Sequence, residues 1–215
     1  MKGKILFTLT FGFVIGGVAY AHTPFLVSPS DVSDWTVVEN PGVSKSFYGE
    51  LTGFPHTYVI EIDETLDLFA RILVPDIEKA QENVSGIIVR NSEEEGRVVE
   101  IARLRAADAY WESEYEFFGG DSYRNGPEYR ATVDHGFYRI EVSTPDNVGK
   151  YVLVVGTKEE REIGYFETLR RIAAIKTFFG KSELMVIQSP FVYVPLALFI
   201  GIFVSIRLWL RRRTV

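Results

Sequence analysis

A chain of 215 residues without cysteine has room for one domain of ordinary size and offers neither a disulfide nor a thiolate for metal binding or catalysis. Its 29 acidic residues outnumber the 23 basic ones, and all 29 lie between His22 and Gln188, where only 17 basic residues are found, so this part carries a net charge of −12. Such a charge argues against nucleic acid and against anionic lipid head groups as ligands, and it is compatible with cations, basic partners or simple solubility.

Residues 1–21 predict a secretory signal peptide. Lys2 and Lys4 precede an uncharged apolar stretch, and Ala19-Tyr20-Ala21 has the A-x-A pattern of a cleavage site. An uncleaved N-terminal anchor is the alternative. Cleavage after Ala21 makes His22 the first residue of the mature chain.

Residues 22–158 predict a mainly β ectodomain. Seven short segments rich in Val, Ile, Phe and Tyr follow one another, several with a period of two, and Gly- or Pro-containing turns such as Pro41-Gly42 separate them. The segments are SFYGEL, TYVIEI, LDLFARILV, GIIVR, VVEIARL, GFYRIEV and KYVLVVG. Because no helical pattern lies between them, we expect a β-sandwich or jelly roll.

The hydrophobic period changes in residues 159–181, which predicts an amphipathic helix before the membrane. Its expected apolar face consists of Ile163, Phe166, Leu169, Ile172, Ile175 and Phe178/Phe179. Arg170, Arg171 and Lys176 are expected on the opposite face, and Gly180 is a stop signal. The helix can lie on the bilayer surface or pack against the sandwich.

Residues 190–210 predict one transmembrane helix. The 20 residues from Phe191 to Leu210 contain a single charge, Arg207, and span about 30 Å as a helix, which is the thickness of a bilayer core. Three arginines follow, and the positive-inside rule therefore predicts that tail residues 211–215 are cytoplasmic. We expect a single-pass protein of the cell membrane with its N-terminal domain outside, periplasmic or extracellular. A buried core helix and a sorting signal are the alternatives.

The run from Phe117 to Gly156 resembles the last strands of pre-peptidase C-terminal (PPC) domains. A polar turn leads to a strand, then to a Gly-aromatic-Tyr strand at Gly136-Phe137-Tyr138 and a Gly-x-Tyr-x-Leu strand at Gly149-Lys150-Tyr151-Val152-Leu153. The resemblance implies a β-sandwich accessory module on an exported, membrane-tethered prokaryotic protein. PPC domains usually accompany catalytic domains, and this sequence shows none.

His22 is the first candidate for chemistry. A mature N-terminal His offers its α-amine and a ring nitrogen as a chelate, and a second imidazole from His56 or His135 completes a three-nitrogen set that suits Cu(II). Copper binding or copper-dependent oxidation is therefore one functional alternative. The two further histidines lie in turn contexts, where solvated histidines are common.

The stretch AYWESEYEFFGGDSY, residues 109–123, is the second candidate. As one strand it places Trp111 and Tyr115 on one face and Glu112 and Glu114 on the other. The simplest interpretation is core aromatics beneath a solvated acidic face. A sugar-binding platform made by these four residues and a calcium site using Glu112, Glu114 or Asp121 are the alternatives.

The sequence favours a non-enzymatic function. It contains no G-x-S-x-G, no P-loop and no H-E-x-x-H, and no other cofactor than copper or calcium is indicated. We therefore expect a recognition, interaction or scaffold module of the cell envelope with a protein partner in the membrane or envelope. Copper-dependent chemistry and carbohydrate binding are the alternatives.

Overall fold

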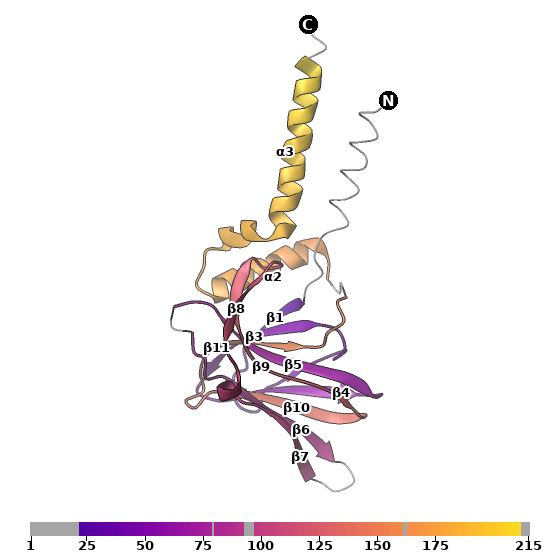
Figure 1. The fold of residues 1–215 in the computed structure, drawn as a ribbon, viewed down its shortest axis with the longest axis vertical. Coiled ribbons are helices and arrows are strands. Elements are labelled where there is room, and N and C mark those ends of the chain that lie inside the picture. Colours follow the sequence, from indigo (N-terminus) through magenta and orange to yellow (C-terminus); the bar gives the residue numbers. More distant parts are fainter. Residues whose placement is uncertain (1–21, 79, 93–96, 161–162, 212–215) are drawn as a thin grey trace.

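The computed structural model describes residues 22–78, 80–92, 97–160 and 163–211 (Figure 1). The predicted signal peptide and tail residues 212–215 lie outside the described residues. In the described part, eleven strands form two sheets, and an amphipathic helix and an apolar helix follow them. The expected fold class, a mainly β sandwich followed by these two helices, is confirmed.

The two sheets have a simple strand order. The first sheet contains β1 (Thr23–Val27), β3 (Lys45–Thr52), β11 (Val148–Val155), β5 (Leu66–Pro75), β9 (Asp121–Val133) and β8 (Glu112–Glu116). The second contains β2 (Trp35–Val37), β4 (His56–Ile62), β10 (Gly136–Ser143), β6 (Ser85–Ser92) and β7 (Arg97–Leu104). A short 3-10 helix, η1 (Ala106–Asp108), connects the sheets between β7 and β8.

The connectivity is that of a jelly roll. With β8 set aside, eight strands remain from β3 to β11, and the first, eighth, third and sixth of them are neighbours in one sheet. The second, seventh, fourth and fifth are neighbours in the other, which makes two Greek keys. The pairs among these eight are antiparallel, whereas β1 and β2 join the edges parallel to β3 and β4.

Strand alternation builds the core between the sheets. On β5, Leu68, Ala70, Ile72 and Val74 point inward and are fully buried, while Phe69 and Leu73 point outward. Tyr151 of β11 forms polar contacts within this core. Its hydroxyl lies 2.7 Å from the Tyr58 hydroxyl and 2.8 Å from His56 Nδ1. The buried hydroxyls therefore have partners, as burial requires.

A bulge shapes β9 beside β8. Gly126 and Pro127 together oppose Ile72 of β5, and proline fits this point because it has no N–H to give to the ladder. The Trp111 ring packs against Gly126 so closely that a Cβ there would overlap it, and the indole donates to the Ala106 carbonyl at 3.1 Å.

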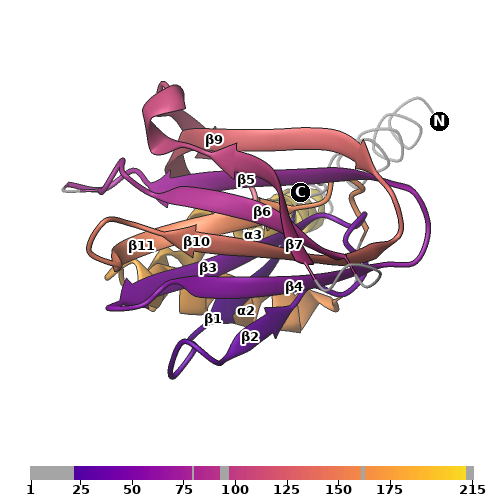
Figure 2. The same cartoon turned by 90° about the horizontal axis from the view of Figure 1, so that it is seen from below.

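Helix α2 (Tyr165–Phe178) packs on the outer face of the six-stranded sheet, and both helices lie behind the sheets when the molecule is seen from below (Figure 2). Ile175 and the following Phe179 lie against Tyr48, Tyr123, Val152 and Val154 of the sheet. Of the two expected positions for the helix, the structure therefore has packing on the sandwich.

Two residues of α2 were assigned to the wrong face from the sequence. The buried residues Thr168, Ile172, Ile175 and Phe179 are spaced by four, three and four, whereas we expected a repeat of three. As a consequence Phe166, expected to be buried, is 83% exposed, and Lys176, expected to be solvated, is 0% exposed.

Lys176 is tolerated in the core because its charge is paired. Its ammonium donates to Asp121 Oδ2 at 2.8 Å and to the Gly120 carbonyl at 3.0 Å, and the Lys181 ammonium donates to Asp121 Oδ1 at 2.6 Å. The Asp121 side chain is buried like that of Lys176. This buried ion cluster, Asp121 with Lys176 and Lys181, fastens the end of α2 to the first residue of β9.

Helix α3 (Pro190–Arg211) leaves the domain beside α2, after the 3-10 helix η2 (Glu183–Gln188) (Figure 1). Its 22 residues have a mean hydropathy of 2.2 in the most apolar window, and no residue of that window is buried. The helix is thus long and apolar enough to cross a membrane, and it is not a core helix of the domain.

The buried ion cluster generates a stability prediction. Asp121→Ala leaves the Lys176 ammonium buried without a carboxylate, so we expect a loss of about 3–5 kcal/mol in unfolding free energy. Glu167→Ala removes a carboxylate whose Arg170 and Arg171 partners are near the surface, and we expect at most about 1 kcal/mol. Thermal unfolding of the full chain in detergent, followed by circular dichroism, measures both. Equal losses would contradict the role of the cluster.

Candidate functional site

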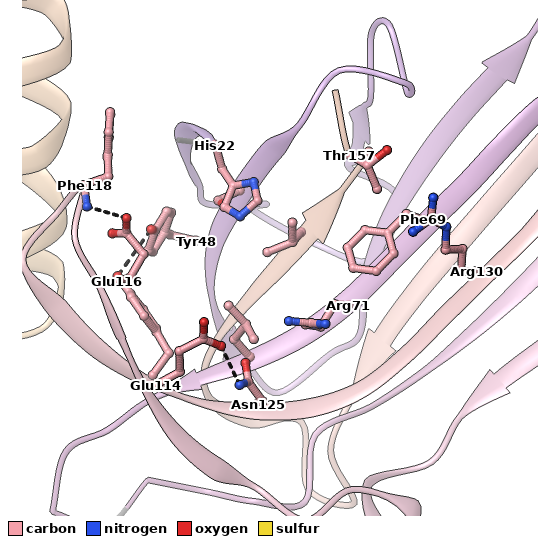
Figure 3. A pocket seen from close by; sticks show the side chains of 15 residues that line it. His22, Tyr48, Phe69, Arg71, Glu114, Glu116, Phe118, Asn125, Arg130 and Thr157 are labelled. Atoms are coloured by element: carbon pink, nitrogen blue, oxygen red, sulfur yellow. Dashed lines mark hydrogen bonds between the residues drawn. The ribbon is translucent and has the colours of Figure 1, made fainter. Parts of the chain in front are cut away.

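A hollow of about 350 Å³ opens on the outer face of the six-stranded sheet (Figure 3). Its floor is apolar and is made by outward side chains of adjacent strands: Phe69 and Leu73 from β5 and Val154 from β11. Tyr48 and Tyr123 close the end that adjoins the apolar cluster under α2. His22 and the β8 carboxylates form the walls.

The period of the strands explains how these residues meet. Outward positions recur every second residue, so β5 presents Phe69, Arg71 and Leu73 in one row, and β9 presents Tyr123 and Asn125 in the next row. Helix α2 covers the other side of the same face. The hollow is the part of the face that the helix leaves open.

Charged and polar groups surround the apolar floor. Arg71 donates from Nε to Glu128 Oε2 at 2.7 Å, and Arg130 donates from Nη2 to Asp67 Oδ2 at 2.7 Å. On the opposite wall, Asn125 donates to Glu114 Oε2 at 2.7 Å, as Figure 3 shows. The rim thus offers guanidinium, amide and carboxylate groups above aromatic and aliphatic side chains.

Glu116 lies in the wall near the Tyr48 ring. Burial raises the pKa of its carboxyl, and the neighbouring Asp121 charge adds to this, although the backbone N–H groups of Phe118 and Gly119 donate to the carboxyl. Burial also raises the pKa of the Tyr48 hydroxyl, which lies 3.3 Å from the Tyr123 hydroxyl. This end of the hollow therefore favours uncharged forms of its acidic groups.

The His22 ring lies over the hollow (Figure 3). Its Nδ1 contacts the Ser44 hydroxyl. Burial lowers the pKa of the imidazole, the Arg71 charge lowers it further, and Glu114 acts in the opposite direction. The neutral imidazole is therefore favoured, and this is the form that binds metals.

The three histidines lie apart. His56 is 1% exposed between the sheets, on the other side of the six-stranded sheet from His22. His135 is in the turn before β10, and six residue pairs of the β4–β10 ladder, about 20 Å, separate that turn from His56. Among the residues described, no group of three or more His, Asp or Glu side chains lies close enough to hold a metal ion.

The four residues of the expected sugar platform also lie in different surroundings and do not form one shared surface. Strand β8 begins at Glu112, after Trp111, whose positive φ of 53° turns its ring toward the sandwich core. Tyr115 is half exposed and meets the Phe117 ring edge to face at 5.0 Å. Glu114 lines the hollow, whereas Glu112 is exposed outside it. Asp121 was expected as a calcium ligand, but its two carboxylate oxygens accept hydrogen bonds from Lys176 and Lys181.

Sequence reasoning missed the centre of the hollow. Phe69, Arg71 and Leu73 were assigned only to a strand, although the alternation in LDLFARILV signals that an arginine shares one face with two large apolar residues. Such a row on the outer face indicates a surface with a second layer above it. What the sequence does not reveal is that α2 covers only part of this row.

Comparisons with known proteins give the fold alone. No family model matches the chain, and no curated protein matches it. Among solved structures, the pre-peptidase C-terminal domain of a collagenase from Bacillus anthracis is similar, with 11% identity, a TM-score of 0.36, and coverage of 59% of this chain and 98% of that domain. This is the type of domain that the sequence from Phe117 to Gly156 resembles.

Two further solved structures are similar at a comparable level. PliG of Salmonella Typhimurium, a periplasmic inhibitor of g-type lysozyme, has 14% identity and a TM-score of 0.30 over 59% of this chain and all of its own. CorA of Methylomicrobium album BG8, a surface-associated copper-binding protein, has 8% identity and a TM-score of 0.27 over 58% of this chain and 98% of its own. These values support no statement about function.

The buried histidine His56 generates a pH prediction. Burial lowers its pKa below the ordinary value of 6.5, so the unfolded chain binds the proton more tightly and stability falls as the pH falls through 6.5. The His56→Gln variant cannot lose stability in this way, because glutamine does not titrate, but it has a weaker contact with the Tyr151 hydroxyl at every pH. We expect wild type to be more stable than the variant at pH 7.5, by about 1 kcal/mol, and this difference to shrink at pH 5.5.

Urea unfolding at the two pH values measures this difference. His135→Gln is the control, because His135 lies in an exposed turn. At pH 7.5 its unfolding free energy should differ from that of wild type by less than that of His56→Gln does. A stability difference for His56→Gln that stays constant between pH 7.5 and 5.5 would rule out titration of the buried imidazole.

Proposed function

We propose that this chain is a membrane-tethered recognition module outside the cytoplasm, and that it binds its ligand in the hollow between His22 and β8. One observation carries the proposal: the hollow lies on the face of the sandwich from which α3 emerges, and it is lined by residues of five strands, β3, β5, β8, β9 and β11, together with His22. An apolar floor with convergent polar groups is the usual character of a ligand site.

The predicted topology supports the same function. A signal peptide and a single apolar helix followed by arginines put the sandwich outside the cytoplasm and hold it at the membrane. The ligand is then a molecule of the envelope with both an apolar face and hydrogen-bonding groups, a description that includes saccharides and side chains of a protein partner. Arg71 and Glu114 contribute charges of both signs.

Photo-crosslinking in the cells that produce the chain tests this proposal. With p-benzoylphenylalanine in place of Phe69, we expect a specific covalent adduct, because the side chain lies in the floor of the hollow. The same group in place of Val98, which is 56% exposed on β7, should give none. Arg71→Glu, which reverses a charge at the rim, should reduce the yield at Phe69 severalfold. Equal yields at both positions would contradict the proposal.

Copper binding at His22 is a second candidate, favoured by the neutral imidazole over the hollow. If the chain is cleaved after Ala21, the free α-amine and the ring of His22 form a two-nitrogen chelate, and Glu114 lines the same hollow as an oxygen donor. Because His56 and His135 lie elsewhere, the chain offers fewer nitrogens than the three that we expected.

Electron paramagnetic resonance with Cu(II) distinguishes this candidate. A chain that begins at His22 should bind one equivalent with nitrogen hyperfine structure, His22→Ala should bind at least tenfold more weakly, and His56→Gln should bind as wild type does. The prediction fails if His22→Ala binds copper with the wild-type affinity and spectrum.

A further inference from the structure

The domain end at the foot of α3 carries exposed apolar side chains whose positions follow from local geometry. In a 3-10 helix, residues three apart lie above one another, so Leu184 and Ile187 of η2 share one face. They are 83% and 52% exposed, whereas Met185 and Val186 between them are half buried against the domain. The apolar face of η2 therefore points away from the sandwich.

A third apolar side chain lies on α2. Phe166 is two residues from the buried Thr168, and two residues correspond to about 200° around a helix, so Phe166 lies on the face opposite the sheet. Its exposure of 83% is explained by this placement. In Figure 1, α2 and η2 lie between the sandwich and α3, so that this opposite face points toward the end from which α3 extends.

The foot of α3 is fixed to the same end by contacts on two sides. The Tyr165 hydroxyl of α2 donates to the Phe191 carbonyl at 2.6 Å, and the hydroxyl of the buried Ser189 donates to the Phe118 carbonyl at 2.6 Å. The Phe118 and Phe191 rings pack edge to face at 4.8 Å. Because these contacts bind α3 to α2 and to the loop after β8, the domain cannot move far from the plane where the apolar helix enters a bilayer.

The charges at this end are compatible with lipid head groups. Arg170, on the same face of α2 as Phe166, is largely exposed and pairs with Glu167, and Lys181 pairs with Asp121. Glu183 in the first turn of η2 is exposed and long enough for its carboxylate to stay in water while Leu184 enters the interface. Apolar side chains continuous with the span and flanked by cations are typical of interfacial segments.

We propose that the exposed face formed by Phe166, Leu184 and Ile187 binds the outer surface of the lipid bilayer, so that the domain lies on the membrane in a fixed orientation. This inference rests on the proposed membrane tether and adds a second, interfacial contact to it. Lipid is the occupant because the surface is continuous with α3 through Ser189 and Pro190. The hollow beside His22 is then held at a constant distance from the head groups.

The absence of native cysteine makes the test direct. Leu184→Cys, Ile187→Cys and Val98→Cys are each labelled with the fluorophore NBD in the full chain, which is reconstituted into vesicles of phosphatidylcholine and phosphatidylglycerol at 3:1. Val98 on β7 is the matched control, since its exposure of 56% is close to that of Ile187 and it lies at the far end of the domain (Figure 1). Ile200→Cys in α3 reports on the span itself.

We expect nitroxide lipids to quench the labels at 184 and 187 at least threefold more than the label at 98, and aqueous iodide to quench them less. If the label at 200 is quenched by lipid but those at 184 and 187 respond to iodide as the label at 98 does, the interfacial contact is refuted and the tether stands. If the label at 200 is not quenched by lipid, both are refuted. Labels at 184 and 187 that neither quencher reaches would show that a second copy covers this face, which also overturns the proposal.

Discussion

The pairing of Lys176 with Asp121 in the buried ion cluster is the constraint on which the arrangement of this molecule depends. A lysine without exposure is compatible with folding only where a carboxylate meets it, and Asp121 is the first residue of β9. This pairing fixes the end of α2 on the sheet. Lys181 uses the second oxygen of the same carboxylate, so the chain that leaves α2 toward η2 is fixed as well.

The position of α3 follows from this constraint. Since η2 and the foot of α3 pack against α2 and the loop after β8, the apolar helix has a defined direction relative to the sandwich. An ion cluster of this kind adds little net stability, because desolvation offsets most of the attraction, but it accepts one partner geometry and rejects others. Its contribution is thus to orientation rather than to the total stability of the fold.

The hollow also results from the position of α2 on the sheet. The outer face of the six-stranded sheet is apolar along the strands, and α2 covers only part of it, around Tyr48, Val152 and Tyr123. Arginines on the remaining part are paired with carboxylates of neighbouring strands, which keeps the floor accessible to a ligand without unpaired buried charges. The proposed ligand site and the contacts of α2 therefore lie on one face of the sheet, which supports the proposal of a recognition module held in a fixed position.

Most of the secondary structure was predictable because local patterns determine it. Strand alternation from Phe47 to Val155, the helical period in residues 159–181 and the apolar run from Phe191 to Leu210 are visible in the sequence, and the structure has the expected elements there. The errors fall where a local pattern competes with packing. The sequence pattern predicts that Trp111 is part of a strand, but a positive φ and the space over Gly126 turn its ring into the core, and neither leaves a signal in the sequence.

Within the described residues, the sequence by itself determined seven of the eleven strands, the sandwich class and helix α3, which is apolar enough to cross a membrane, since these depend on hydrophobic period and length. Only the tertiary structure decided that Lys176 is buried, that Phe166 is exposed, and that His22 lies over Phe69 and Arg71 rather than near His56. These outcomes depend on side chains far apart in the chain. Asp121 is 55 residues from Lys176 in the sequence, and no local pattern predicts which carboxylate pairs with a buried lysine.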